Sequence, residues 1–335
     1  MVTIKDVAKE TGLGISTISK YLNGGNVREK NKLAIDGAIE KLGFTANEFA
    51  RGLKTKKSHT VGVVIPELSN LFITSIISVV EDILRKNGYG VIVCDCRTNE
   101  EQEREAIRFL MGKMVDGIIN MPVSIDGKHL FPLIENEIPI ILLDRMIPQL
   151  REHVNAVLVD NVSASASAIK LLFDAGHTNI GIILGPRDVF TSQQRLLGYS
   201  QVFIQNSLLP DESRIIFSDY TVQGGYESMK RLLKDNNLTA VYTTNYEMTL
   251  GALIAINESG VNIPEQISFV GFDNVYLAQV IRPKLTIVTQ PIEEIGRHTA
   301  EILLSLFSSG TKLTETKVIT LSTQISEGRS VKFLQ

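Results

Sequence analysis

The sequence predicts two structural classes in one chain: an all-α module over about the first 45 residues, and an α/β body with parallel sheets after it. Three observations support this prediction. Short amphipathic helical patterns fill residues 3–43, and β-rich runs alternate with helical patterns from Thr60 onward. Residues 1–60 carry 11 Lys and Arg against 6 Asp and Glu, whereas the rest of the chain carries 23 against 31. A basic module joined to an acidic body suggests that the small part meets a polyanion.

Composition places the chain among globular proteins that bury a large core. The 335 residues are 44% hydrophobic and 21% charged, and no apolar run approaches the length of a membrane span. The N-terminal "MVTIKDVAKE" has charges where a secretory signal has its apolar core, so we expect a cytoplasmic location. Cys94 and Cys96 are the two cysteines, and no nearby His completes a ligand set, so we expect reduced thiols and no metal site.

The first helical pattern begins at Thr3, which forms a capping box with Asp6. It ends at Gly12, where a tight turn between two helices needs a residue free to adopt positive φ. The second helix is expected at about Ile15 to Leu22, before the "NGG" that stops it, and the third at about Glu29 to Leu42. Three such helices close a small core, and the first two have the arrangement of a helix-turn-helix motif.

The second helix has two chemically different faces. Its inward face is apolar, and the outward face offers hydroxyl groups and a cation, which suit phosphates and base edges. The inward residues are Ile18, Tyr21 and Leu22, and the outward residues are Ser16, Thr17, Ser19 and Lys20. Plain packing of a helical pair is the alternative interpretation, and the basic charge and the following segment favour DNA binding.

These residues resemble the headpiece and hinge of the LacI/GalR family of bacterial transcription regulators. The stretches that carry the resemblance are "TIKDVAKETGLGISTISKYLNG" and "GFTANEFARGLKTKKSHTVGVVIP". The resemblance implies that Ile15, Ser16 and Lys20 contact bases in the major groove, and that Thr17, Ser19 and Asn31 hold phosphates. It also implies a hinge helix at about Ala46 to Leu53 in the minor groove, where Leu53 wedges between base steps. The DNA contacts expected there are Asn47, Ala50, Leu53 and Lys56.

Three points qualify the headpiece. Ile15 meets a thymine methyl group or packs inward beside Ile18, and we favour the groove. Gly14 stands where the family usually has a serine cap, and replacing that serine with glycine destabilises the helix by only a few tenths of a kcal/mol. Ala46 stands where the family usually has proline, so the hinge is expected to order less readily.

From Thr60 the chain is a succession of short β-rich runs and amphipathic stretches that end at glycine. The runs are "TVGVVI", "VIVCD", "VDGIIN", "IPIILL", "NIGIIL", "LTAVYT" and "ISFVGF". This order predicts parallel sheets covered by helices on both faces, and its length suggests two lobes rather than one sheet.

The family resemblance implies an effector domain of two periplasmic-binding-protein-like lobes joined by three crossings. We expect the crossings near Asp160, Gln290 and Ser322. The expected division is a headpiece at 1–45, a hinge helix and linker at 46–59, and an effector-binding and dimerisation domain at 60–335. Lobe 1 is expected at about 60–160 and 291–321, and lobe 2 at about 161–290 and 322–335.

Polar side chains gather in the loops that follow the predicted strands, where an α/β domain binds its ligand. These are Arg145, Arg195, Tyr220, Asn245 and Asp273. Fork-shaped polar groups and an aromatic ring suit the hydroxyls and the C–H face of a sugar. The resemblance implies that Arg195, Asn245 and Asp273 contact the effector and that Phe72, Tyr220 and Gln290 line the cleft. Departures at Tyr246 and Leu71 leave the identity of the ligand open.

Enzyme motifs are absent from the sequence. No glycine-rich dinucleotide turn, phosphate loop or nucleophile elbow occurs, and the histidines have no metal-ligand spacing. We therefore expect no catalytic activity, no cofactor and no metal. The expected function is a homodimeric regulator, most simply a repressor, that binds a palindromic DNA operator under the control of a sugar or sugar derivative. The alternatives are a sugar-binding protein that does not bind DNA, and control by a purine or a partner protein.

Overall fold

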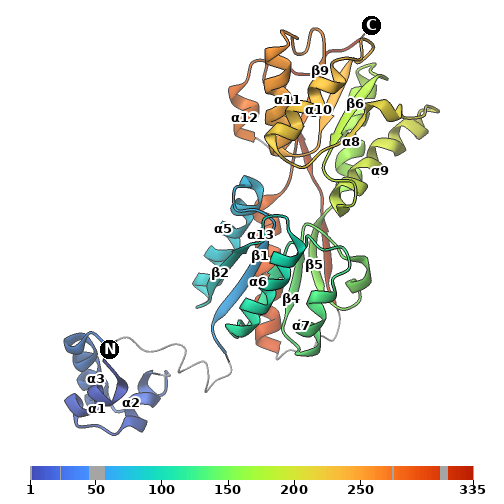
Figure 1. Ribbon diagram of the computed structural model, residues 1–335. Helices are drawn as coiled ribbons and strands as arrows, with labels where there is room; N and C mark the ends of the chain where they lie inside the picture. The colour runs from blue at the N-terminus through green and yellow to red at the C-terminus, as the bar shows by residue number, and fades with distance from the viewer. Residues whose placement is uncertain (1, 23, 45–56, 274, 310–315, 335) are drawn as a thin grey trace. The chain divides into compact units, whose positions relative to one another are not determined.

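The computed structural model describes residues 2–22, 24–44, 57–273, 275–309 and 316–334. The chain divides into two compact units, Met1–Ser58 and His59–Gln335. The described residues of the first unit form helices and turns, and the second unit is built on two six-stranded sheets (Figure 1).

The N-terminal unit contains helices α1 (Ile4–Thr11), α2 (Ile15–Leu22) and α3 (Glu29–Leu42). Its core consists of Val7, Ile18, Ile35 and Ala38, so each helix contributes at least one fully packed side chain. Gly12 ends α1 in the left-handed conformation with φ 68°, which glycine adopts at no steric cost. These helices confirm the predicted helix-turn-helix fold.

The first lobe of the larger unit has a sheet with strand order β11-β5-β4-β3-β1-β2, and every neighbouring pair is parallel. The strands are β1 (Thr60–Ile65), β2 (Gly90–Asp95), β3 (Gly117–Asn120), β4 (Ile140–Leu143), β5 (Asn155–Val159) and β11 (Val318–Leu321). Its helices are α5 (Leu71–Lys86), α6 (Glu100–Gly112), α7 (Phe131–Glu135) and α13 (Ile292–Ser309), with short 3₁₀ turns at Lys128–Leu130 and Pro148–Leu150.

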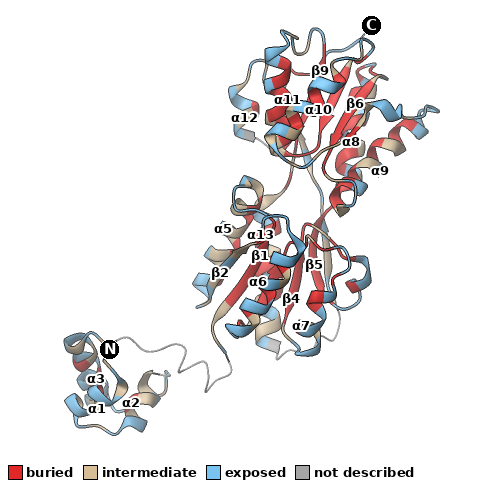
Figure 2. Ribbon diagram, in the orientation of Figure 1, coloured by how far each residue is buried: buried red, intermediate tan, exposed pale blue. Residues whose placement is uncertain are grey.

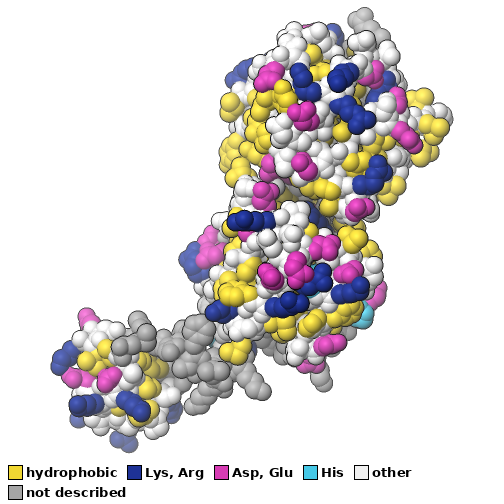
Figure 3. All heavy atoms as spheres, viewed as in Figure 1, with side chains coloured by type: hydrophobic (Ala, Val, Ile, Leu, Met, Phe, Trp, Pro, Cys, Tyr) yellow, Lys and Arg dark blue, Asp and Glu magenta, His cyan; other side chains and the backbone are white. Residues whose placement is uncertain are grey.

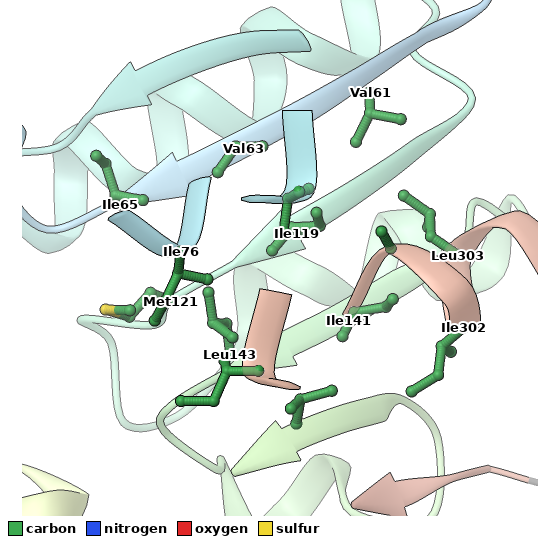
Figure 4. Packing of buried hydrophobic residues seen from close by; sticks show 14 of the residues in the cluster. Val61, Val63, Ile65, Ile76, Ile119, Met121, Ile141, Leu143, Ile302 and Leu303 are labelled. Carbon is green, nitrogen blue, oxygen red and sulfur yellow. The ribbon is translucent and has the colours of Figure 1, made fainter. Parts of the chain in front are cut away.

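Helices cover both faces of this first sheet. On one face, side chains of α5 and α13 such as Ile76 and Leu303 pack on Val61, Val63 and other strand residues (Figure 4). On the other face, α6 and α7 pack on the alternate strand residues, including Val64. Burial on both faces explains why the strands are nearly continuous apolar runs.

The second lobe has strand order β12-β10-β9-β8-β6-β7, in which only the pairing of β10 with β12 is antiparallel. The strands are β6 (Ile180–Leu184), β7 (Ile215–Phe217), β8 (Ala240–Thr243), β9 (Ser268–Phe272), β10 (Thr286–Thr289) and β12 (Gln324–Ser326). The helices are α8 (Asn161–Asp174), α9 (Phe190–Gln205), α10 (Val222–Leu232), α11 (Tyr246–Glu258) and α12 (Val275–Val280), with a 3₁₀ turn at Glu212–Arg214. The central strands β6, β8 and β9 are buried along their whole length, whereas β7 and β12 are only partly buried (Figure 2).

The chain passes between the two lobes three times: between β5 and α8, between β10 and α13, and between β11 and β12. The two sheets, each with helices on both faces, confirm the predicted α/β class. Among the described residues, no helix is both long enough and apolar enough to cross a membrane.

The last residues of the chain are held against the second lobe by a buried histidine. Nε2 of His177 donates to the carbonyl of Lys332 at 2.9 Å, and its Nδ1 lies 3.0 Å from the hydroxyl of Thr239. The backbone N–H of Leu334 also donates to the carbonyl of Ala175. Burial lowers the pKa of His177, so the folded state favours the neutral ring.

We predict that His177→Ala destabilises the larger unit by about 1–3 kcal/mol, because the buried partners of the ring lose their hydrogen bonds. A group with a lowered folded pKa stabilises the fold above its unfolded pKa, and this contribution is lost as the pH falls through the folded pKa. The difference in Tm between the parent and His177→Ala should therefore shrink from about pH 7.5 to about pH 5.5. Thermal melts at several pH values test this, and a constant difference contradicts the role assigned to the neutral ring.

Candidate functional site

Helix α2 presents its polar face to solvent. Ser16 and Lys20 are exposed, and Ile15 is 46% exposed and does not belong to the core that contains Ile18. The burial of Ile18 and the partial exposure of Ile15 favour the interpretation in which Ile15 faces outward. Figure 3 shows several Lys and Arg side chains on the surface of this unit.

The remaining residues predicted to bind DNA fall into two sets. Thr17, Ser19 and Asn31 are half-buried, so each keeps part of its surface exposed. Asn47, Ala50, Leu53 and Lys56 lie outside the described residues, and so does the expected hinge helix at Ala46 to Leu53.

A cleft between the two lobes brings together the seven residues predicted to bind the effector. The lining residues include Phe72, Arg145, Arg195, Tyr220, Asn245, Asp273 and Gln290. Phe72 and Arg145 come from the first lobe. Tyr220, Asn245, Asp273 and Gln290 follow strands of the second lobe. Arg195 lies within α9, so its predicted position in a strand-end loop was wrong. Segments far apart in the sequence meet here because the carboxyl ends of the parallel strands face the cleft.

Arg195 is a buried cation held by several neighbours. It lies on α9 and is 4% exposed. Its Nε donates to Oδ1 of Asn161 at 2.8 Å, and its Nη1 donates to the carbonyl of Thr244. The guanidinium carbon lies 4.1 Å from the ring centroid of Phe272. These contacts fix the plane of the guanidinium group at the floor of the cleft.

Asp273 follows β9 in the left-handed conformation, with φ 67°. Nε2 of Gln290 donates to both of its carboxylate oxygens at 2.9 Å. Burial raises the pKa of Asp273 to about 7, and the nearby charge of Arg195 opposes this shift. A non-glycine residue in this conformation costs about 1–3 kcal/mol, which is a frequent property of ligand sites.

Tyr220 is also left-handed, with φ 66°. Its hydroxyl lies 2.9 Å from Oγ1 of Thr191 and 2.8 Å from Oγ of Ser192, both at the start of α9. Its ring lies against Gly185, where a Cβ atom would approach the ring to 2.0 Å. The glycine therefore makes room for an aromatic wall of the cleft.

The sequence patterns missed Glu247, which joins two helix N-termini across the cleft. Asn70 caps α5 in the first lobe, and Asn245 caps α11 in the second. The amide nitrogen of Asn70 donates to Oε1 of Glu247 at 3.1 Å, and that of Asn245 donates to Oε2 at 2.6 Å. Burial raises the pKa of Glu247 to about 7. A glutamate in the first turn of a helix is ordinarily a solvated residue that favours the helix dipole, so only the fold shows its second contact.

Arg145 and Asp144 form the first-lobe side of the cleft. Nη1 of Arg145 donates to the carbonyl of Pro122 at 3.1 Å, and its Nε lies 3.8 Å from Oδ2 of Asp144. Asp144, which sequence reasoning also missed, has φ 63°. Phe72 is half-buried and packs against the core of the first lobe.

No group of metal-ligating side chains was found in the part of the chain that the structure describes. Cys94 and Cys96 are free thiols there, and burial raises the pKa of Cys96 to about 11. A thiol with a raised pKa is a poor nucleophile at neutral pH.

Comparison with known proteins identifies both units. Residues 3–47 match the bacterial regulatory proteins of the lacI family, and residues 169–331 match the periplasmic binding protein-like domain. The chain is 31% identical to catabolite control protein A of Priestia megaterium over 334 residues, which cover 99% of each protein. The chain belongs to the LacI family. It is a DNA-binding transcriptional regulator, and its relatives are regulators rather than enzymes.

Solved structures of the LacI family share the fold. The transcriptional regulator CelR in complex with cellobiose is 27% identical, with a TM-score of 0.74 over 98% of this chain and 100% of that one. A LacI-family regulator from Enterococcus faecium with bound ribose is 26% identical, with a TM-score of 0.72 over 82% of this chain and 100% of that one. Both of these relatives hold a sugar.

We predict that Gly185→Ala displaces the ring of Tyr220 and destabilises the larger unit by about 1–3 kcal/mol, as overpacking does. If the clash with Tyr220 is the cause, adding Tyr220→Ala to Gly185→Ala should cost much less than the two single changes together. Urea unfolding of the two single variants and the double variant measures this coupling. Additive losses would mean that Gly185 does not serve to seat Tyr220.

Proposed function

We propose that the protein binds a palindromic DNA operator as a homodimer and that a small carbohydrate in the cleft controls this binding. In this proposal α2 enters the major groove with Ile15, Ser16 and Lys20 toward the bases. Thr17, Ser19 and Asn31 hold phosphates. The exposed polar face of α2 above a closed core supports this orientation. The hinge at 46–53, with Asn47, Ala50, Leu53 and Lys56, is proposed to enter the minor groove.

Two arguments support a dimer. One recognition helix contacts too few base pairs for useful specificity, and two helices related by a twofold axis match a palindrome. Tyr276 and Val280 lie one turn apart on α12 and are 84% and 77% exposed. Two large apolar side chains on one exposed helix face favour burial against another protein surface.

The observation that supports a carbohydrate effector is the cleft itself. Its floor holds a fixed guanidinium group, Arg195, beside the carboxyl of Asp273 and the amide of Asn245. Tyr220 and Phe72 supply rings from opposite lobes. Polar groups in fork geometry bind neighbouring hydroxyls, and a ring packs on the C–H face of a sugar. CelR and the Enterococcus faecium regulator hold cellobiose and ribose, respectively.

Control by the effector follows from thermodynamic linkage. A ligand changes DNA affinity only through its different affinities for the DNA-bound and the free conformation, typically by about 5- to 150-fold. The two lobes can rotate about the three crossings that join them. We propose that this closure of the cleft changes the spacing of the two 46–53 segments of the dimer.

A thermal-shift screen tests the proposal. Sugars, sugar acids, sugar phosphates and purines are each added to the purified protein, and every ligand that raises Tm is then used in DNA gel shifts. We expect a carbohydrate to raise Tm and to change the fraction of DNA bound. A purine that does both would replace the carbohydrate, and the absence of any small-molecule effect would favour a partner protein. Failure to retain fragments of its own promoter region would favour a binding protein without a DNA function.

For the recognition helix, we predict that Lys20→Ala lowers operator affinity and reduces the preference for operator over random DNA, because its ammonium group contacts a base edge. Lys56→Ala is the matched control, since a phosphate contact weakens binding to all sequences alike. Gel shifts on operator and random duplexes at fixed salt measure both effects. A Lys20→Ala protein that keeps the discrimination of the parent would reject the assignment.

For the cleft, we predict that Arg195→Ala removes the influence of the effector on DNA binding, because the fixed guanidinium fork is lost. Arg195→Lys keeps the charge but replaces the fork, and should also weaken the response, by about tenfold or more. The measured quantity is the ratio of operator Kd values with and without the sugar identified by the screen. Circular dichroism verifies folding, and an undiminished ratio in a folded variant would remove Arg195 from the site.

A further inference from the structure

We infer that the cleft accepts a carbohydrate that carries no phosphate or carboxylate group, and that Glu247 is a specificity residue that excludes anionic sugars. This inference rests on the proposed carbohydrate function and narrows its ligand class. It depends on the charges and on the hydrogen-bonding capacity of the described residues around the cleft.

Carboxylates outnumber cations in the lining. Among its described residues, four are acidic and two are basic. The acidic residues are Glu67, Asp144, Asp219 and Asp273, and the basic residues are Arg145 and Arg195. The cations have internal partners: Arg145 lies beside Asp144, and Arg195 is held by Asn161 and Thr244. The lining thus carries a net negative charge before a ligand enters.

Glu247 adds a further carboxylate at the edge of the cleft. Its two oxygens accept hydrogen bonds from Asn70 and Asn245, which both line the cleft from opposite lobes. None of the ion pairs found among the described residues includes Glu247. Partial burial strengthens its electrostatic effect on a charged neighbour.

The helix N-termini at this edge are capped by side chains of the protein itself. A helix N-terminus ordinarily attracts a phosphate or carboxylate. Here the side chain of Asn70 accepts from the N–H of Ile73 at the start of α5, and that of Asn245 accepts from the N–H of Met248 at the start of α11. The carboxylate of Glu247 lies between the two cap residues and accepts a hydrogen bond from each. A side chain of the protein therefore takes the position near the helix N-termini that an anionic ligand would take.

Two buried acceptor oxygens of the cleft lining have no hydrogen-bond donor among the described residues. Oδ1 of Asp144 and Oε1 of Gln290 have no hydrogen-bond partner within the described residues, and both residues are more than nine-tenths buried. A buried acceptor without a partner costs about 1–3 kcal/mol. Sugar hydroxyls and ammonium groups donate to such oxygens, whereas ionised phosphate and carboxylate groups only accept. Nε of Arg145 is a buried donor of the same lining without a hydrogen-bond partner among the described residues, and either a sugar hydroxyl or an anion can accept from it. The two unpartnered acceptors are the groups that favour a hydroxyl-bearing neutral ligand, as the net charge does.

The first test uses the full-length protein and three matched sets of probes. The sets are glucose, glucosamine, glucose 6-phosphate and glucuronate; ribose and ribose 5-phosphate; and cellobiose and cellobiose 6-phosphate. Calorimetric titrations at about pH 8 keep both carboxyls with pKa values near 7 mostly ionised. We expect that in any set that binds, each anionic member binds at least about tenfold more weakly than its neutral parent, a difference of about 1.4 kcal/mol.

The outcomes separate this inference from the proposed function. An anionic sugar that binds as tightly as its neutral parent overturns the inference and leaves a carbohydrate effector standing. If no member of any set binds, the carbohydrate function and the inference fail together.

The second test measures whether Glu247 is the residue that weakens the binding of anionic sugars. Glu247→Gln should reduce the ratio of the Kd values for the anionic and neutral sugars by about tenfold, because the isosteric amide removes the charge. Glu212→Gln is the matched control, since Glu212 is exposed in the same lobe and lies before β7, at the strand end away from the cleft. Circular dichroism verifies folding of both variants. An unchanged ratio in folded Glu247→Gln would mean that Glu247 does not exclude anions.

Discussion

Because every neighbouring strand pair of the first sheet is parallel, and all but one pair of the second, the loops that follow the strands collect at one edge of each sheet. Helices on both faces leave these edges as the places where polar side chains gather. The three crossings then set the two edges opposite each other. Residues as distant in sequence as Phe72 and Gln290 line one cleft for this reason.

Burial of Arg195 and Asp273 at that cleft is tolerated because both groups have specific partners. The guanidinium of Arg195 has Asn161, a carbonyl and an aromatic face, and both carboxylate oxygens of Asp273 accept from Nε2 of Gln290. An unpaired buried charge costs several kcal/mol, so removing one member of this network affects the rest. The left-handed backbone at Tyr220 and Asp273 adds a further cost that the surrounding lobe sustains. The polar side chains on the second-lobe side of the cleft are therefore held in place before a ligand binds.

The sequence patterns located the parts of the fold that have strong periodicity. The seven quoted apolar runs correspond to β1, β2, β3, β4, β6, β8 and β9. They did not include β7 and β12, which are three residues long and too short to show a period, or β10 and β11, which are four residues long. The run at Asn155–Val159, which is β5, was not included either, although it is fully buried and has the same apolar pattern as the runs that were.

For the site, residues at strand ends were predictable because their position follows from topology. Asn245 and Asp273 follow β8 and β9 and line the cleft. Arg195 also lines the cleft, but it lies in the second turn of α9 and not in the predicted strand-end loop. Glu247 was not predictable in this way, because its contact with Asn70 joins positions 177 residues apart and belongs to the pairing of the lobes. That contact also bears on control. Glu247 accepts hydrogen bonds from Asn70 in one lobe and Asn245 in the other, so both bonds can form only when the lobes are close. A ligand that competes for Asn70 or Asn245 would therefore change the free energy of bringing the lobes together.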